Sequence, residues 1–142
     1  MNKVLPIAAA AVMLGVGAMA LSGQAQEMGT PAADTNSVFA AMTPDSNGTV
    51  AQKIMNAPAG DVLALEIGRL PKQVYTKQDD LLYVVSGYGT ASIGYPTVDV
   101  KPGSLVSIPR NTAFEVKANG NAPIRAILIA TPHDNPDNKR VL

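Results

Sequence analysis

The sequence predicts a single all-β domain, an antiparallel barrel or sandwich, and three observations support this prediction. Apolar runs of strand length alternate with turn signals from about residue 49 to residue 130. Clusters rich in glycine, proline and asparagine separate these runs, for example at 56–60, 101–103 and 119–121. The chain has 142 residues, of which 46% are hydrophobic. This is typical of one domain with one packed core.

The N-terminal residues have the features of a signal peptide. Lys3 supplies a positive charge, residues 4–21 form an apolar and glycine-rich run, and the small residues Gly23 and Ala25 follow. Signal peptidase recognises such a pattern, so we expect cleavage after Ala25 (signal peptide 1–25) and a periplasmic or secreted protein. The run is also about as long as a bilayer span, so an uncleaved anchor is the alternative. After cleavage we expect no further contact with the membrane.

The remaining chain divides into three parts. Residues 26–36 are small and polar without an apolar period, which indicates a flexible leader. Residues 37–131 form the predicted domain. It opens with a short helical segment over 37–42, started by Asn36 or Ser37 and ended by Thr43 and Pro44. Residues 132–142 are polar and rich in turn formers, so we expect a C-terminal tail that packs loosely or not at all.

The candidate strands within the domain share strand length and turn-forming flanks. The first could equally be a helix, because Val50, Ile54 and Met55 also fit a helical period, but we favour a strand. The nine candidates cover residues 49–55, 62–69, 73–75, 81–85, 90–93, 97–100, 104–108, 113–117 and 124–130.

Composition excludes several classes of function. Eleven basic residues balance eleven acidic ones, so the chain has no broad positive surface for nucleic acid. Cysteine is absent, which removes thiol catalysis and thiolate metal sites. The one histidine, His133, lies in the tail, where we expect it to be exposed. A multi-histidine metal site or a Ser-His-Asp triad therefore cannot form inside the domain.

Two segments of the sequence resemble the paired motifs of the cupin superfamily. The first runs from Gly68 to Gly87 and contains Asp80, and the second runs from Gly103 through Pro109 to Phe114. The resemblance covers about residues 49–130. It implies a double-stranded β-helix, the jelly-roll barrel of the cupins, preceded here by a short helical segment.

The resemblance fails where the metal ligands of cupins lie. Three histidines and a glutamate hold the metal in that family, and the matching positions here are Val74, Thr76, Asp80 and Phe114. Valine and phenylalanine carry no donor atoms for a metal, and a threonine hydroxyl is a poor ligand. A shift of one residue places Gln73 and Tyr75 at two histidine positions, which does not restore the site.

We therefore expect no metal and no other cofactor. The alternative is a hard-cation site at Asp79 and Asp80 with backbone oxygens. We favour instead two solvated turn acids, or an Asp80 that is hydrogen-bonded at the barrel rim.

If the barrel forms, the four mismatched residues should line its interior, because alternate residues of each strand face inward. Val74, Thr76, Asp80 and Phe114 would then make an apolar pocket with few polar groups, with Arg110 at its rim. A barrel filled by side chains is the alternative. An apolar lining should raise the pKa of Asp80, which makes this residue a candidate catalytic acid or base.

Three functions remain open. We favour an exported, metal-independent cupin that binds a small organic ligand or acts as an accessory protein. The first alternative is a metal-free isomerase, epimerase or lyase that acts on a sugar or organic acid through Asp80. The second is a filled-barrel structural or interaction module. The family resemblance also suggests a homodimer. Tyrosines 75, 83, 88 and 95 could form a stacking surface, although we favour core or interface positions for them.

Overall fold

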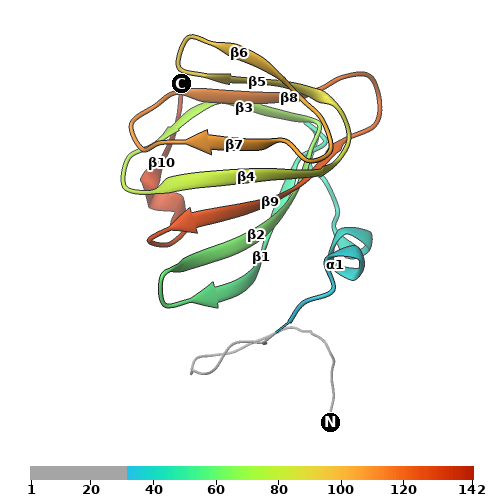
Figure 1. The fold of residues 1–142 in the computed structure, drawn as a ribbon, viewed down its shortest axis with the longest axis horizontal. Helices are drawn as coiled ribbons and strands as arrows, with labels where there is room; N and C mark the ends of the chain where they lie inside the picture. Colours follow the sequence, from blue (N-terminus) through green and yellow to red (C-terminus); the bar gives the residue numbers. More distant parts are fainter. Residues whose placement is uncertain (1–31) are drawn as a thin grey trace. The chain divides into compact units, whose positions relative to one another are not determined.

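Two antiparallel sheets of five strands each form the body of residues 32–142, the part of the chain that this computed structural model describes (Figure 1). The prediction of an all-β double-stranded β-helix with one short helix is confirmed. The predicted signal peptide and residues 26–31 of the leader lie outside the described residues. Within residues 32–142, no helix has the length and hydrophobicity that crossing a membrane requires.

The strands of each sheet come from distant parts of the chain. The first sheet has the order β1 (Val50–Ala57), β2 (Gly60–Ile67), β9 (Ile124–Thr131), β4 (Asp79–Ser86) and β7 (Leu105–Ile108). The second has the order β10 (Lys139–Val141), β3 (Arg69–Tyr75), β8 (Phe114–Ala118), β5 (Gly89–Ile93) and β6 (Thr97–Val100). The strand interpretation of residues 49–55 is correct, since β1 pairs along its length with β2.

The core lies where the inward faces of the strands meet. Strand β4 shows the alternation clearly, with Leu82 and Val84 buried and Leu81 and Tyr83 exposed. Side chains from β2, β7, β8 and β9 complete this apolar cluster, among them Leu65, Ile67, Ile108, Val116, Ile124 and Leu128.

Helix α1 (Thr35–Ala41) begins two residues before the predicted start because Asp34 caps it. One carboxylate oxygen of Asp34 accepts from the backbone N–H of Asn36 at 3.0 Å, and the other accepts from the Ser37 hydroxyl at 2.7 Å. The helix buries Phe39, whose ring centroid lies 5.5 Å from the guanidinium of Arg125.

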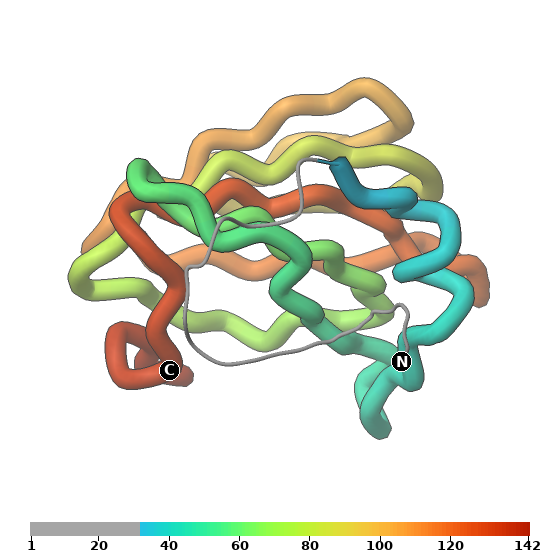
Figure 2. Tube along the Cα trace, turned by 90° about the horizontal axis from the view of Figure 1, so that it is seen from below, coloured from blue at the N-terminus to red at the C-terminus, as the bar shows by residue number. Residues whose placement is uncertain are grey.

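The C-terminal tail packs on the barrel, contrary to the loose segment that we expect from the sequence. A short 3₁₀ helix (Pro136–Asn138) leads into β10, which pairs with β3 so that Lys139 lies opposite Tyr75 and Val141 opposite Gln73. Figures 1 and 2 show this segment at the end of the domain away from α1. The tail is therefore an edge strand of the second sheet.

A bulge in β3 decides which of its side chains face inward. Leu70 pairs with Val116 and Gln73 with Phe114, so β3 advances three residues while β8 advances two. Pro71 lies in this interval and has no N–H to donate to a ladder. One extra residue in a strand reverses its facing pattern beyond that point. Gln73 therefore faces the interior, and its neighbour Val74 lies on the other face.

Two glycines of the predicted motifs, Gly87 and Gly103, differ in how closely neighbouring backbone packs against them. Gly87 and Gly103 have similar positive φ angles of 91° and 93°. A methyl group on Gly87 would lie 2.5 Å from the Pro123 carbonyl oxygen, whereas one on Gly103 would meet nothing within 4 Å. Both alanine variants carry the backbone penalty of about 1–2 kcal/mol, and only Gly87→Ala adds a backbone clash.

We therefore predict that Gly103→Ala lowers the free energy of unfolding by about 1–2 kcal/mol and that Gly87→Ala lowers it by clearly more. Urea denaturation measures both values. Equal losses would contradict the close packing of β4 against the start of β9.

Candidate functional site

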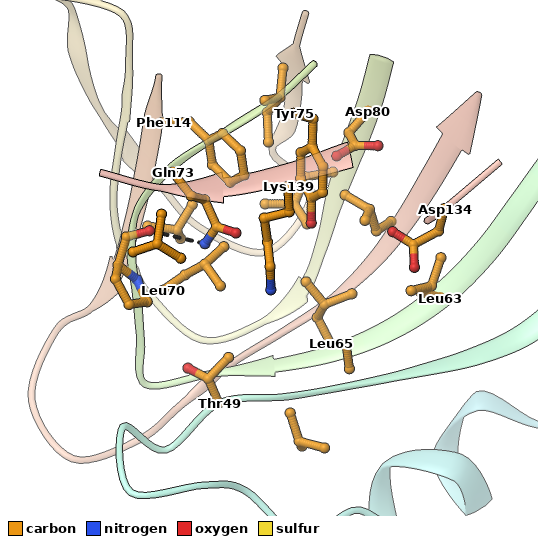
Figure 3. Close-up of a pocket in the computed structure, with 18 of the residues that line it drawn as sticks. Thr49, Leu63, Leu65, Leu70, Gln73, Tyr75, Asp80, Phe114, Asp134 and Lys139 are labelled. Atoms are coloured by element: carbon orange, nitrogen blue, oxygen red, sulfur yellow. Dashed lines mark hydrogen bonds between the residues drawn. The ribbon is translucent and has the colours of Figure 1, made fainter. Parts of the chain in front are cut away.

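The barrel contains an open cavity of about 420 Å³, a size usual for small-molecule sites. Both sheets line it, together with the turn before β1 and the C-terminal tail (Figure 3). Most of its wall is apolar, with Leu63, Leu65, Leu70, Leu82, Ile108, Val116 and Leu128 among the lining residues. Tyr75 and Phe114 add a stacked aromatic pair, with centroids 5.5 Å apart and ring planes 18° apart.

Two buried oxygen atoms in this wall have no hydrogen-bond partner within residues 32–142. They are Oε1 of Gln73 and Oδ2 of Asp80, and each residue is only 2% exposed. The other polar atom of each side chain is engaged: Gln73 Nε2 donates to the Pro71 carbonyl at 2.9 Å, and Asp80 Oδ1 accepts from Gln78 at 3.0 Å. Figure 3 shows both side chains at the cavity. Buried acceptors normally have a hydrogen-bond partner, so these two oxygen atoms are candidate contacts for a bound molecule.

The environment of Asp80 raises its pKa. Burial is the main cause, and the carboxylates of Asp134 and Asp79 add to it, while the hydrogen bond from Gln78 opposes it. The pKa of Asp80 rises from 3.8 to about 6. Burial and the nearby Asp80 and Asp134 carboxylates also raise the pKa of Tyr75, so its phenol stays neutral. The raised Asp80 pKa agrees with the expectation from an apolar lining.

Gln78 connects Asp80 to the C-terminal tail and is fully buried. Its Nε2 donates to Asp80 at 3.0 Å and to Asp134 at 3.3 Å. Its Oε1 accepts from the backbone N–H of Asn135 and from the Asn138 amide, both at 3.3 Å. The side-chain amide of Gln78 therefore orients the Asp80 carboxyl and also binds the C-terminal tail.

Asp61 provides a second anchor for the tail. This buried carboxylate accepts from Lys53 Nζ at 2.9 Å and from the Asp134 backbone N–H at 2.9 Å, and it lies 3.1 Å from His133 Nδ1. Burial works to raise the pKa of Asp61, but the hydrogen bonds from Lys53, His133, Asp134 and Asn56 lower it overall. His133 is exposed, as expected from the sequence, and its ring also contacts Asp61.

Of the five residues predicted to line the pocket, the structure places two in the cavity wall and three outside it. Asp80 and Phe114 line the cavity, whereas Val74, Thr76 and Arg110 do not. The bulge in β3 turns Val74 away, and the Thr76 hydroxyl donates to the Asn138 carbonyl at 3.1 Å. Arg110 forms an exposed ion pair with Asp79, at 2.9 Å between Nη2 and Oδ2.

The one-residue shift of the motif gives the inward positions correctly, since Gln73 and Tyr75 line the cavity. Sequence reasoning misses Asp134 and Lys139, which the tail contributes. A strand of three residues shows too little alternation to reveal a facing pattern. The tyrosines do not share one surface: Tyr75 lies in the cavity, while Tyr83, Tyr88 and Tyr95 are exposed.

Comparison with known proteins supports the fold. The cupin domain family model matches residues 62–130. Solved structures with the same fold include the nucleoside dehydratase Pac13 of Streptomyces, with a TM-score of 0.60 and 19% identity over 69% of this chain and 81% of that one. KdgF from Halomonas sp. has a TM-score of 0.56 and 15% identity over 63% of this chain and 83% of that one.

An uncharacterized double-stranded β-helix protein of Klebsiella pneumoniae has a TM-score of 0.62 and 13% identity over 73% of this chain and 92% of that one. No curated protein matches the sequence with statistical significance. The family match, the two-sheet topology and the motif glycines agree, and the chain is a member of the cupin superfamily.

The residues of this cavity do not fit the metal centre of the superfamily. The inward positions that correspond to its ligands hold Gln73, Tyr75, Asp80 and Phe114, which supply one carboxylate and no imidazole. Within the described part of the chain, no group of three histidine, cysteine, aspartate or glutamate side chains is placed to hold a metal ion. A transition-metal site needs more nitrogen, sulfur or carboxylate donors than this set provides.

The raised pKa of Asp80 has a consequence for stability. The folded state holds the Asp80 proton more tightly than the unfolded chain, so this group stabilises the fold below about pH 4 and the effect is lost as the pH rises through about 6. The difference from 3.8 corresponds to at most roughly 3 kcal/mol.

We predict that Asp80→Asn, which keeps an oxygen for Gln78, is more stable than the wild type at pH 7.5 by up to about 3 kcal/mol and loses this advantage at pH 4. Urea denaturation at the two pH values measures it. Asp79→Asn is the control and should not be stabilised at pH 7.5, because Asp79 is exposed and Arg110 lowers its pKa. A gain for Asp79→Asn but none for Asp80→Asn would contradict the burial of Asp80.

Proposed function

We propose that this chain is an exported cupin that binds a small organic molecule without a transition metal, through hydrogen-bond donors that meet Gln73 and Asp80. The observation that carries the proposal is the pair of buried, unpartnered acceptors in a mostly apolar cavity. A buried acceptor without a partner costs about 1–3 kcal/mol. A molecule with hydroxyl or amino groups at these two points removes that cost.

The cavity wall supports the same conclusion. The Tyr75–Phe114 pair offers a flat aromatic surface, and the leucines of β2, β4 and β9 supply apolar contact. Small-molecule sites typically combine such a lining with a few orienting polar groups. An open cavity of about 420 Å³ argues against the filled-barrel alternative.

Export rests on the N-terminal sequence alone. The basic start, the apolar run and the small residues at 23 and 25 favour cleavage after Ala25 and a periplasmic or secreted location. The absence of cysteine agrees with a domain that needs no disulfide in an oxidising compartment.

The second candidate is a metal-independent enzyme, an isomerase, epimerase or lyase, with Asp80 as its acid or base. The specific observation in its favour is the Asp80 pKa of about 6, because an acid-base group works best with a pKa near the working pH. Among the structural neighbours, Pac13 is a nucleoside dehydratase and has been solved with uridine. That likeness shows a shared fold and makes an enzyme of this class a reasonable alternative.

Native mass spectrometry of protein from an exporting host tests the leading candidate. We predict a chain that begins at Gln26 and carries one organic adduct and no metal. Asp80→Asn and Gln73→Leu should lose most of the adduct, since a hydrogen bond to a buried acceptor is worth about 1–3 kcal/mol, or roughly five- to hundredfold in affinity.

The control is Asp79→Asn, which removes the neighbouring carboxylate outside the cavity and should keep the adduct. Stoichiometric iron, manganese, zinc or copper in the wild type would contradict the proposal. Conversion of the released molecule by the wild type, with a rate that changes near pH 6, would favour the enzyme instead.

We also propose a homodimer that forms through the outer face of the first sheet. Large apolar side chains lie side by side there: Leu81 is opposite Ile129, and Tyr83 is opposite Leu105. All four are exposed by 39% or more. A contiguous exposed apolar face usually marks an interface, and a two-fold contact lets the same patch meet itself.

Size-exclusion chromatography with light scattering tests the dimer. We predict that the wild type elutes as a dimer and that Leu81→Lys elutes as a folded monomer, because a lysine would be buried at the centre of the contact. Tyr95→Lys is the control, since this fully exposed tyrosine lies in the turn between β5 and β6, and it should remain dimeric. A monomeric wild type, or a dimeric Leu81→Lys, would contradict this interface.

A further inference from the structure

The C-terminal strand β10 contributes a lysine, Lys139, to the cavity lining. Neither the two sequence motifs nor the other described strands contribute a cationic residue to this lining. Along β10, Lys139 and Val141 line the cavity, while Arg140 between them does not. The register gives the reason: Lys139 lies opposite Tyr75, and Val141 lies opposite Gln73, the two inward residues of β3. Strand alternation then turns Arg140 to the other face.

Lys139 is the one cationic residue among those that line the cavity within residues 32–142. Three arginines that do not line the cavity pair with carboxylates: Arg69 with Glu115, Arg110 with Asp79 and Arg125 with Glu66. Lys139 forms no ion pair with any described residue. Figure 3 shows its side chain extending into the cavity, with the ammonium end directed away from Asp80.

The remaining charges of the lining have partners or lie near Asp80. Asp45 accepts from the backbone N–H groups of Asn47 and Thr49. Asp134 accepts from Gln78, which also binds Asp80. Besides the backbone-bonded Asp45, the charged lining therefore consists of acceptors with negative charge around Asp80 and the unpaired ammonium group of Lys139, which lies on an exposed strand.

We propose that the ligand is a hydroxylated carboxylic acid, such as a sugar acid, whose carboxylate binds Lys139 and whose hydroxyl groups donate to Asp80 and Gln73. This inference rests on the proposed binding function and names its ligand class. The opposite orientation is unfavourable, because it brings the ligand carboxylate next to Asp80 and Asp134. The charge pattern thus selects both the class of ligand and its direction in the cavity.

Isothermal titration calorimetry with matched probes tests the assignment. D-glucuronate and D-glucose form one pair, and D-gluconate and D-sorbitol form another; the members differ by a carboxylate in place of a hydroxymethyl group. In low salt at pH 7.5 we expect the acid of at least one pair to bind about tenfold more tightly than its neutral partner, a ratio that corresponds to one charge-assisted contact. The ratio should fall as salt screens the ammonium group.

Variants of β10 identify the residue responsible. Lys139→Gln should reduce the acid-to-neutral ratio to near one without weakening the neutral partner, and Lys139→Arg should keep most of the ratio. Arg140→Gln removes the same charge one residue away and should leave the ratio unchanged. A ratio near one in the wild type, or equal effects of the Lys139 and Arg140 variants, would overturn the ligand class while leaving the binding function intact.

Two further outcomes would count against the inference for different reasons. If neither member of any pair binds at millimolar concentration, while the native protein still carries an organic adduct, the ligand class is wrong and the binding function stands. If Lys139→Gln keeps the ratio and makes the protein self-associate, the lysine protects the exposed edge of β10 and is not a ligand contact.

Discussion

The burial of one carboxyl group, that of Asp80, is the constraint on which the site depends. A carboxylate leaves water at a considerable cost unless its oxygens are paired. Here only one oxygen is paired, by a Gln78 amide that is itself buried and that bonds the C-terminal tail at three points. The tail in turn is fixed to β2 by Asp61. Asp80 is therefore oriented by Gln78 with its second oxygen buried and unpartnered, and this burial is the main cause of its raised pKa.

Much of the fold follows from the sequence because its signals are local. Apolar runs with turn residues between them place the strands, and the paired glycine and proline motifs single out the cupin barrel. The errors at strand ends have local causes as well. Residues 62–69 read as one apolar run, yet the chain changes sheets at Gly68, where a methyl group would collide with the Asn47 carbonyl of the preceding turn.

The site was harder to predict because it depends on a bulge and on a long-range contact. Counting from Gly68 places Val74 and Thr76 inward, but the extra residue at Leu70–Gln73 reverses the faces, so Gln73 and Tyr75 occupy those positions. Nothing in a single sequence fixes where a strand takes up one extra residue. The pairing of β10 with β3 joins residues more than 60 positions apart. The three residues of β10 are too few to show the alternation of apolar and polar side chains that would predict a strand.

In this barrel, hydrogen-bonding groups stand at the inward positions that correspond to the metal ligands of the superfamily. Carboxyl, amide and phenol side chains now occupy the inward positions, with hydrocarbon and an aromatic pair around them. Such a set can orient a polar molecule or exchange a proton with it, and it offers few of the donors that transition metals prefer. The C-terminal strand completes the wall, so the site belongs to the whole domain and not to the two motifs alone.

The titration of the Asp80 carboxyl, followed by ¹³C NMR on the ligand-free protein and assigned with the Asp80→Asn variant, tests the central claim most directly. A buried, half-paired carboxyl facing an apolar cavity should titrate with a midpoint near pH 6. A midpoint near the ordinary value of 3.8 would show that water or a cation reaches this oxygen, and would contradict the account.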